Sequence, residues 1–437
     1  MKARHNRRQF GQLMGGCGVA LLSGLRGGTS PLLQAATPPA PESLKMHAGR
    51  VIEILERHIE TGYMTGAVAL LGRGSHAEVV TVGEGSRETA GLMRRDSLFR
   101  ITSMTQPITA AVTLMLIDEG KLRLGERVDH WLPELAHRRV LRSPTGSIDD
   151  TVPTRRPIIV EDLLTFRCGL GISPSAVEDS PIQRRIAELK LPGFGPPMPA
   201  SPLSPDEWLH RLGTLPLLAQ PGETWLYNTG SALLGVLIER VVQKPLPQLL
   251  HERLFGPLGM KDTAFVIPAA KTARLVSAYR LESGRAQLED AAAASLWMSA
   301  PAFPDGAAGL ISTADDYFAF SYFLMSQGHP AGMRLLSREW IAAMTSDHLT
   351  ATQRAAAAPI LGESRGWGFG LAVVTATTAQ GIPRGAYGWI GEFGTSWVAD
   401  PASETSAILL TQTLFGSPEP PAVHQEFWSA VFSPPLL

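Results

Sequence analysis

Ser103 stands where a nucleophile could act, directly before an apolar stretch, residues 104–118, that predicts a helix. Unpaired backbone N–H groups and the helix dipole at such a start favour negative charge, so a serine there could attack a carbonyl. The alternative is a capping box, in which Ser103 caps the helix and Gln106 reaches back. Pro107 argues against the cap, because it lacks an N–H and should bias Gln106 away from helical geometry.

Signatures of other reactive centres do not occur in the sequence. It has no Cys-x-x-Cys motif, no His-Glu-x-x-His motif and no Cys/His cluster, so we expect no metal site and no cofactor. It has no Gly-x-Ser-x-Gly elbow, which disfavours an α/β-hydrolase fold. If the segment that carries Cys17 is removed, Cys168 is left alone and no intramolecular disulfide can form. A lone cysteine such as Cys168 is usually a small buried hydrophobe.

Hydrophobic patterns predict the elements that would position these residues. Residues 67–73 and 78–83 predict a hairpin, and 140–156 predict a polar loop. Residues 171–205 are rich in Pro and Ser and predict an irregular segment with one short helix near 181–189. Helices are predicted at 46–62, 104–118, 205–213, 229–243, 246–254, 314–327, 337–345 and 421–432, and strands at 367–376, 386–390, 394–400 and 405–413.

Strands at both ends, with helices and loops between them, predict an α/β fold of the α+β type interrupted by a mainly helical lobe. We expect an export signal and linker at 1–40, a discontinuous α/β body at 41–135 and 295–437, and the mainly helical and loop lobe at 136–294. A cleft between two such lobes is a common place for a binding site.

Size and charge exclude several classes of protein. The 437 residues can enclose a large core, and 44% of them are hydrophobic. A net charge of −1 gives no field that would recruit nucleic acid or an anionic membrane. Outside the N-terminal region, no run of about twenty apolar residues occurs, so we expect no membrane span. The oligomeric state is left open by the sequence.

The first forty residues have the layout of an export signal: a basic start, a Gly-rich apolar middle, then small residues and prolines. Residues 6–10, Asn-Arg-Arg-Gln-Phe, resemble a twin-arginine signal, which predicts export, to the periplasm, of the folded protein. A disordered basic N-terminus is the alternative. A lipoprotein cysteine at Cys17 is disfavoured, because the apolar run continues beyond it.

Six blocks, in order along the chain, resemble the serine β-lactamase-like superfamily, which includes class C β-lactamases, serine-type D-Ala-D-Ala carboxypeptidases (penicillin-binding proteins) and related esterases. The esterase branch is the most similar for two reasons. The third motif, residues 389–391, reads Trp-x-Gly, and Tyr227 lies seven residues before a Leu-Gly pair. The resemblance implies an antiparallel sheet flanked by helices, plus the helical lobe. The blocks are residues 99–122, 156–170, 215–241, 254–265, 305–320 and 387–412.

The resemblance implies a role for three residues. Ser103 would be the nucleophile, and Tyr227 would relay its proton together with a lysine one turn after the serine. Gln106 occupies that lysine position, and an amide cannot act as a base near neutral pH, although it can orient a hydroxyl or a water. Without the lysine, Tyr227 loses the cation that would favour its phenolate. The alternative for Tyr227 is a core tyrosine whose hydroxyl is satisfied.

Other site residues are implied by the same resemblance. The backbone N–H of Glu392 would be the second oxyanion donor, beside that of Ser103, and Trp389 and Gly391 would line the site. Asn228 would hydrogen-bond the substrate, or it caps the helix that comes after it.

Two side chains of the third motif depart from the family pattern. Ile390 adds bulk and Glu392 adds a carboxylate near the oxyanion position, although alternating side-chain direction could turn that carboxylate away. Glu392 could also replace the missing base, and Trp389 could simply pack in the core.

Two functions compete on these grounds. The first is an exported serine hydrolase that acts through a Ser103 acyl-enzyme on a small ester, amide or β-lactam, with an esterase specificity favoured over a true β-lactamase. The second is a pseudoenzyme that keeps the cleft to bind a ligand or partner, as Gln106, Ile390 and Glu392 would favour. Ser103, Tyr227, Trp389 and Gly391 favour the hydrolase.

Overall fold

The computed structural model describes residues 42–173, 180–282 and 284–433. The expected export signal and linker, 1–40, lie outside the described residues. All of the described residues belong to one compact unit.

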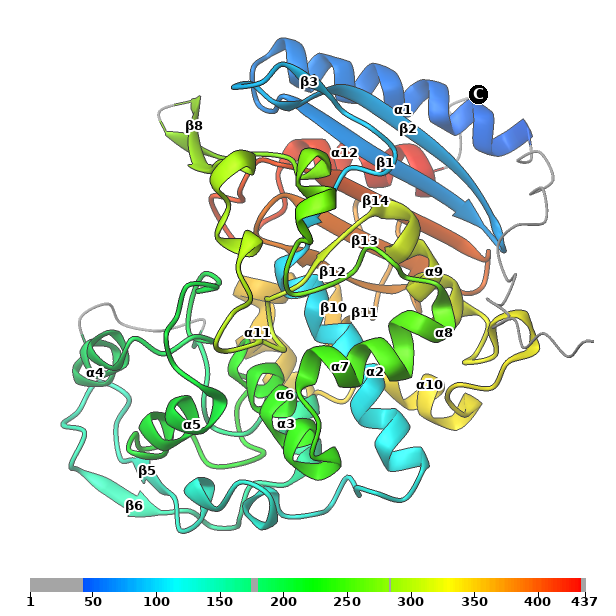
Figure 1. Cartoon of the computed structure of the whole chain (residues 1–437). Coiled ribbons are helices and arrows are strands. Elements are labelled where there is room, and N and C mark those ends of the chain that lie inside the picture. Colours follow the sequence, from blue (N-terminus) through cyan, green and yellow to red (C-terminus); the bar gives the residue numbers. More distant parts are fainter. Residues whose placement is uncertain (1–41, 174–179, 283, 434–437) are drawn as a thin grey trace, which may run out of the picture. The chain divides into compact units, whose positions relative to one another are not determined.

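An eight-stranded antiparallel sheet forms the main body, with the strand order β10-β11-β12-β13-β14-β1-β2-β3 (Figure 1). The hairpin β1–β2 pairs on its other side with β14, so strands from the two ends of the described chain are neighbours in the sheet. The strands are β1 Gly66–Arg73, β2 His76–Ser86, β3 Gly91–Leu92, β10 Arg365–Trp367, β11 Ala372–Val374, β12 Tyr387–Gly391, β13 Thr395–Asp400 and β14 Thr405–Thr411.

Alternating side chains on the central strands build a separate core on each face of this sheet. On β1, Val68 and Leu70 join the core that includes α2 Thr105–Asp118 and α9 Ala314–Met325. Ala69 and Leu71 join the other core, which α1 Glu42–Glu60 and α12 Ala422–Phe432 cover. The sheet is therefore antiparallel and flanked by helices, as predicted.

The remaining elements are short helices and two-stranded ladders. The α-helices are α3 Val160–Leu164, α4 Pro181–Leu189, α5 Pro205–Gly213, α6 Thr229–Val242, α7 Leu246–Leu250, α8 Gly256–Leu258, α10 Arg338–Met344 and α11 Ala351–Leu361. The ladders pair β4 Phe99–Arg100 with β9 Ile311–Ser312, β5 Arg139–Leu141 with β6 Thr151–Pro153, and β7 Ala278–Glu282 with β8 Arg285–Asp290. A 3₁₀ turn, η1 Thr102–Met104, leads into α2.

Several predicted boundaries were wrong. The predicted polar loop 140–156 contains strands, since β5 and β6 pair and Arg139 bonds the Thr151 side chain across them. The single strand predicted at 367–376 covers the end of β10, a turn and the whole of β11. The predicted helix 246–254 becomes a π-helical turn after Leu250. Helix α11 and the hairpin β7–β8 were not predicted.

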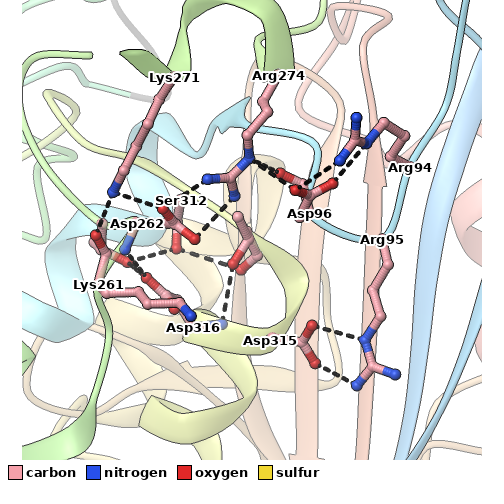
Figure 2. A network of polar contacts seen from close by, with 12 residues as sticks. Arg94, Arg95, Asp96, Lys261, Asp262, Lys271, Arg274, Ser312, Asp315 and Asp316 are labelled. Carbon is pink, nitrogen blue, oxygen red and sulfur yellow. Dashed lines mark hydrogen bonds and ion pairs between the residues drawn. The ribbon is translucent and has the colours of Figure 1, made fainter. Parts of the chain in front are cut away.

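A network of ion pairs holds the segment that leads into β4 and the site (Figure 2). Asp262 pairs with Arg274, at 2.9 and 2.8 Å, and with Lys271. Arg274 also pairs with Asp96, in the turn before β4. Asp316, in the first turn of α9, accepts from the backbone N–H of Asp262 at 2.7 Å. The network therefore joins three segments that are distant in sequence.

Candidate active site

Ser103 lies in the 3₁₀ turn η1, between two buried neighbours, and its own side chain is partly exposed. Thr102 before it has a φ of +40°, an uncommon conformation for a residue with a side chain. No capping box forms, because α2 starts at Thr105 without a side-chain cap. Ser103 is thus placed by a turn that leaves its hydroxyl available.

The predicted effect of Pro107 was wrong. Gln106 is helical, in the first turn of α2, and Pro107 lies in the same turn. A proline is tolerated there, because the first N–H groups of a helix have no intrahelical partner in any case. The consequence is that Gln106 lies in the first turn of α2, directly after the turn that carries Ser103.

The Gln106 side chain is fully buried and joins two other site residues. Its Nε2 donates to Tyr227 Oη at 3.1 Å and to Asn228 Oδ1 at 2.9 Å. Its Oε1 has no hydrogen-bond partner within the described part of the chain. A lysine ammonium would bring three donors and a charge, whereas this amide brings two donors and no charge.

Tyr227 Oη contacts side chains from three other segments of the site. It accepts from Gln106 Nε2 and from Trp389 Nε1, the latter at 3.3 Å, and the Ser103 side chain lies close enough to lower its pKa. Burial raises the pKa of Tyr227 above its ordinary value; the bonds with Ser103, Gln106 and Trp389 lower it in part, and the Glu392 charge raises it. The phenolate is thus supported by neutral donors alone.

Asn228 faces the site and does not cap a helix. It precedes α6 with a φ of +85°, it makes no side-chain cap bond, and its Oδ1 accepts from Gln106. The backbone of the residue before it is held against Ile172, because Tyr227 and Ile172 exchange two N–H···O bonds of 2.9 Å each. The start of the predicted irregular segment 171–205 therefore borders the site.

Strand β12 approaches Ser103 closely because residue 391 is glycine. A Cβ at Gly391 would lie 2.3 Å from the carbonyl oxygen of Ile101 and 2.3 Å from Thr395 Oγ1. No side chain larger than hydrogen fits in that space without a shift of the strand. The close approach brings the backbone of Glu392 toward the turn that carries Ser103.

The two unusual side chains of the third motif behave differently. Ile390 packs against the core under α1 and α12, so its bulk lies away from Tyr227, which is on the other face. Glu392 is half-buried, and burial raises the pKa of its carboxyl, opposed by Arg280 and reinforced by Glu289. The negative charge of Glu392 reaches Tyr227 and disfavours its phenolate.

Aromatic side chains wall one side of the site. Trp389 is 5% exposed, so it packs in the core as the alternative predicted, and it also donates to Tyr227. Phe166 and Trp225 contact Tyr227, with ring centroids 5.9 and 5.8 Å away. Trp367 packs edge-on against Trp389 at 4.7 Å. The sequence reasoning did not single out Phe166, although it lies in the block 156–170, or Trp367, which lies outside the six blocks.

Neither the described lysines nor Cys168 supply a base to this site. None of the lysines in the described ranges bonds Ser103, Gln106 or Tyr227, and three of them pair with carboxylates elsewhere. Cys168 is buried, its Sγ–H donates to the Leu170 carbonyl at 3.4 Å, and burial raises the pKa of its thiol to about 12. Such a thiol is not a nucleophile at neutral pH. Residues 42–173, 180–282 and 284–433 contain no cluster arranged to hold a metal ion and no helix able to cross a membrane.

The fold and the order of the motifs agree with one protein family, because residues 51–426 match the model of the Beta-lactamase family. The chain belongs to the Beta-lactamase family, which confirms the resemblance seen in the sequence. The site assignments themselves stay predictions.

Three known proteins are similar to this chain over most of its length. "Protein Rv1367c" of Mycobacterium tuberculosis is 37% identical over 81% of this chain and 87% of its own. "Esterase EstB" of Burkholderia gladioli is 29% identical over 84% of this chain and 91% of its own. The solved structure of "EstCE1, a hydrolase with promiscuous acyltransferase activity" superposes with a TM-score of 0.76 and 25% identity, covering 90% of this chain and 100% of that one.

Proposed function

We propose that this chain is an esterase or acyltransferase that works through a Ser103 acyl-enzyme on a small neutral ester, amide or related acyl donor. The observation that carries the proposal is the position of Tyr227 Oη, which lies beside the Ser103 side chain and accepts hydrogen bonds from two N–H donors. This arrangement can take the serine's proton without a lysine. The esterases and acyltransferases among its relatives support the same class.

The reaction begins when Ser103 Oγ attacks the carbonyl carbon and its proton passes to the Tyr227 phenolate. The carbonyl oxygen becomes an oxyanion, for which the backbone N–H groups of Ser103 and Glu392 are the proposed donors. Tyr227 then returns the proton to the leaving alcohol or amine as the bond to it breaks. The acyl group stays on Ser103 until water or an alcohol attacks it by the same proton path.

Gln106 holds the tyrosine in place and supplies no proton. Its Nε2 contributes one of the neutral bonds that stabilise the phenolate, and its bond to Asn228 orients the amide. Because no cation lowers the pKa of Tyr227, the reactive phenolate is scarce at neutral pH. The enzyme is accordingly expected to be slow at pH 7 and faster at alkaline pH.

Glu392 bears on the choice of substrate. Its carboxyl is half-buried just after β12 and its charge acts on Tyr227. A carboxylate-bearing β-lactam would meet this negative charge, whereas a neutral ester would not. We therefore place neutral esters first and β-lactams last among the substrates.

The test is steady-state hydrolysis of p-nitrophenyl butyrate, compared with a chromogenic cephalosporin. We expect ester turnover by the wild type, increased release of nitrophenol when a short alcohol is added as acceptor, and no turnover by Ser103→Ala. If the wild type and Ser103→Ala release nitrophenol at the same rate, the chain is not a Ser103 hydrolase. Saturable binding of the ester without turnover would then favour a ligand-binding pseudoenzyme, which the uncharged Gln106 also suits.

We also propose that the first forty residues export the protein. The support is their sequence alone: two adjacent arginines, Arg7 and Arg8, before a Gly-rich apolar run. Cell fractionation should find the chain in the periplasm, shortened at its N-terminus. Replacing Arg7 and Arg8 by lysine should leave it in the cytoplasm at full length, and an unchanged distribution would contradict a twin-arginine route.

A further inference from the structure

A second pocket, away from Ser103, lies between the C-terminal end of α11, β10 and α12. Its volume is about 320 Å³, large enough for a small organic ligand. None of Ser103, Gln106 and Tyr227 lines it, so it is distinct from the candidate active site. Arg365 and Trp428 line it, with Ile360, Leu361, Gln380 and Gln425 among the other lining residues.

Arg365 is the feature that gives this pocket a chemical preference. It lies on the edge strand β10, it is only partly exposed, and it forms no ion pair or hydrogen bond with the side chains of the described ranges. Its guanidinium lies 5.6 Å from the ring centre of Trp428. Burial alone, with no anion to oppose it, lowers the pKa of Arg365. A guanidinium so placed lacks the counter-charge that such groups ordinarily have.

The Trp428 ring forms part of the pocket wall next to Arg365. Its side chain is 1% exposed, and its Nε1 has no acceptor within the described part of the chain. Buried indole N–H groups normally find a partner. Because that indole N–H is itself buried, the Arg365 guanidinium is the donor that the pocket offers, and a guanidinium suits an anion.

The walls favour a ligand with an apolar body. Pro359, Pro418 and Pro420 contribute rigid apolar surface, together with Ile360 and Leu361.

The other polar groups of the pocket are already engaged. Gln425 accepts from Gln380 at 3.1 Å and donates to the Pro420 carbonyl at 2.8 Å. Glu419, the carboxylate that lines this pocket, is exposed and accepts from Gln425 at 3.4 Å, so it does not neutralise Arg365.

We propose that this pocket binds a small organic carboxylate with an aryl or short alkyl body, whose carboxylate pairs with Arg365. A planar guanidinium and a carboxylate can form two parallel hydrogen bonds, and the body would rest on the proline walls. A cavity of about 20 Å³, lined by both Arg365 and Trp389, adjoins the pocket on the side of β12. The bound ligand would therefore lie near the strand whose Trp389 donates to Tyr227.

The test is calorimetric titration of the full chain with benzoate, and with neutral benzamide as the matched uncharged probe. Benzoate should bind at one site, and benzamide at least about tenfold more weakly, because it lacks the charge that Arg365 would pair. Arg365→Gln should lose at least about tenfold in benzoate affinity. Arg338→Gln, which removes an exposed arginine on α10, should bind benzoate like the wild type.

Two further measurements keep the test decisive. The unliganded Arg365→Gln protein should melt no lower than the wild type, because the substitution removes a poorly solvated, unpaired charge. If it fails to fold, Arg365→Lys replaces it and should show intermediate affinity, since the charge remains and the fork is lost. Equal benzoate affinity in wild type and Arg365→Gln, equal affinity for benzamide, or no saturable binding of benzoate at millimolar concentration would each overturn the proposal.

Discussion

At the scale of single residues, the uncharged side chain of Gln106 separates the proposed mechanism from one that uses a lysine. Gln106 hydrogen-bonds to Tyr227 and Asn228, but its amide cannot act as an acid or a base near neutral pH. Its Oε1 is buried without a partner among the described residues, which costs about 1–3 kcal/mol. A buried amide that costs stability but still donates a hydrogen bond to Tyr227 suits a site in which Tyr227 takes part in the reaction.

The pH dependence of the reaction should report this missing charge. Because burial raises the pKa of Tyr227, the phenolate fraction grows about tenfold per pH unit through the neutral and mildly alkaline range. The logarithm of kcat/KM for p-nitrophenyl butyrate should thus rise with a slope of about one between about pH 7 and pH 9. A profile that is flat across this range would exclude Tyr227 as the base.

Gln106→Lys should shift that profile to lower pH. An ammonium beside Tyr227 favours the phenolate and lowers the pKa of the tyrosine, so kcat/KM at pH 7 should increase by about tenfold or more. Gln106→Met is the matched neutral control, with similar length and no donor, and it should be slower than the wild type. Pre-steady-state and steady-state rates of the three proteins at pH 7 test this order. A Gln106→Lys protein no faster than the wild type would contradict it.

Tyr227→Phe tests the hydroxyl while leaving the ring in its aromatic wall. Loss of the proton carrier should reduce kcat by roughly a hundred- to ten-thousand-fold. The melting temperature should fall only modestly, because the contacts with Phe166 and Trp225 remain and the lost bonds are those of one hydroxyl. A variant with wild-type kcat would show that Tyr227 is a core residue only.

At the scale of elements, the distance between β12 and the η1 turn sets the geometry of the site. Gly391→Ala should force the strand away from Ile101, because the new Cβ would be 2.3 Å from its carbonyl oxygen. We expect a loss of activity of at least about a hundredfold and a clear fall in melting temperature. Gly416→Ala, where a Cβ meets nothing within 4 Å, is the control and should change neither quantity.

The elements also show which signals the sequence carries. The helix at 104–118 and the hairpin at 67–83 were predicted nearly in full, because both are strongly apolar and end at clear turns. Helix α11 was missed although Thr350 and Gln353 form a capping box at its start. Its alanine-rich sequence has no amphipathic period, and Pro359 lies inside it. Both features argue against a helix when the sequence is considered alone.

The candidate site was predictable only as a set of residues. Family motifs indicated Ser103, Gln106, Tyr227 and Trp389, and the structure brings them together. The direction of each hydrogen bond depends on segments distant in sequence, so no local pattern could supply it. The same holds for Ile390, whose side-chain direction is set by the pairing of β12 and not by its neighbours in the sequence.

At the scale of the whole molecule, buried carboxyls should shape the stability. Burial raises the pKa of Asp305 and of Asp316 to about 6, so the folded chain binds these protons more tightly than the unfolded chain does. Their contribution therefore increases stability as pH falls from about 6 toward 4. Asp262, whose pKa the nearby Arg274 and Lys271 hold at about 2 despite burial, acts oppositely and loses its contribution below about pH 4.

Asp305→Asn isolates one of these contributions. Asp305 accepts from the Ala307 N–H at 2.8 Å through Oδ1, which an amide oxygen can replace. The variant should melt higher than the wild type at pH 7, where the difference in unfolding free energy should be on the order of 3 kcal/mol, and this difference should shrink as pH falls from about 6 toward 4. Thermal melts across this pH range test it, and an equal pH dependence in both proteins would contradict the assignment.

The most direct test of the central claim, that Ser103 is acylated without a lysine, is intact-protein mass spectrometry after brief exposure to p-nitrophenyl butyrate or a fluorophosphonate. We predict a single adduct on the wild type, which forms faster at alkaline pH than at pH 7. The adduct should be absent in Ser103→Ala, and at pH 7 it should form faster in Gln106→Lys than in the wild type. An unmodified wild type at every pH, with adduct formed by Gln106→Lys alone, would contradict the claim and leave a binding protein that lacks its base.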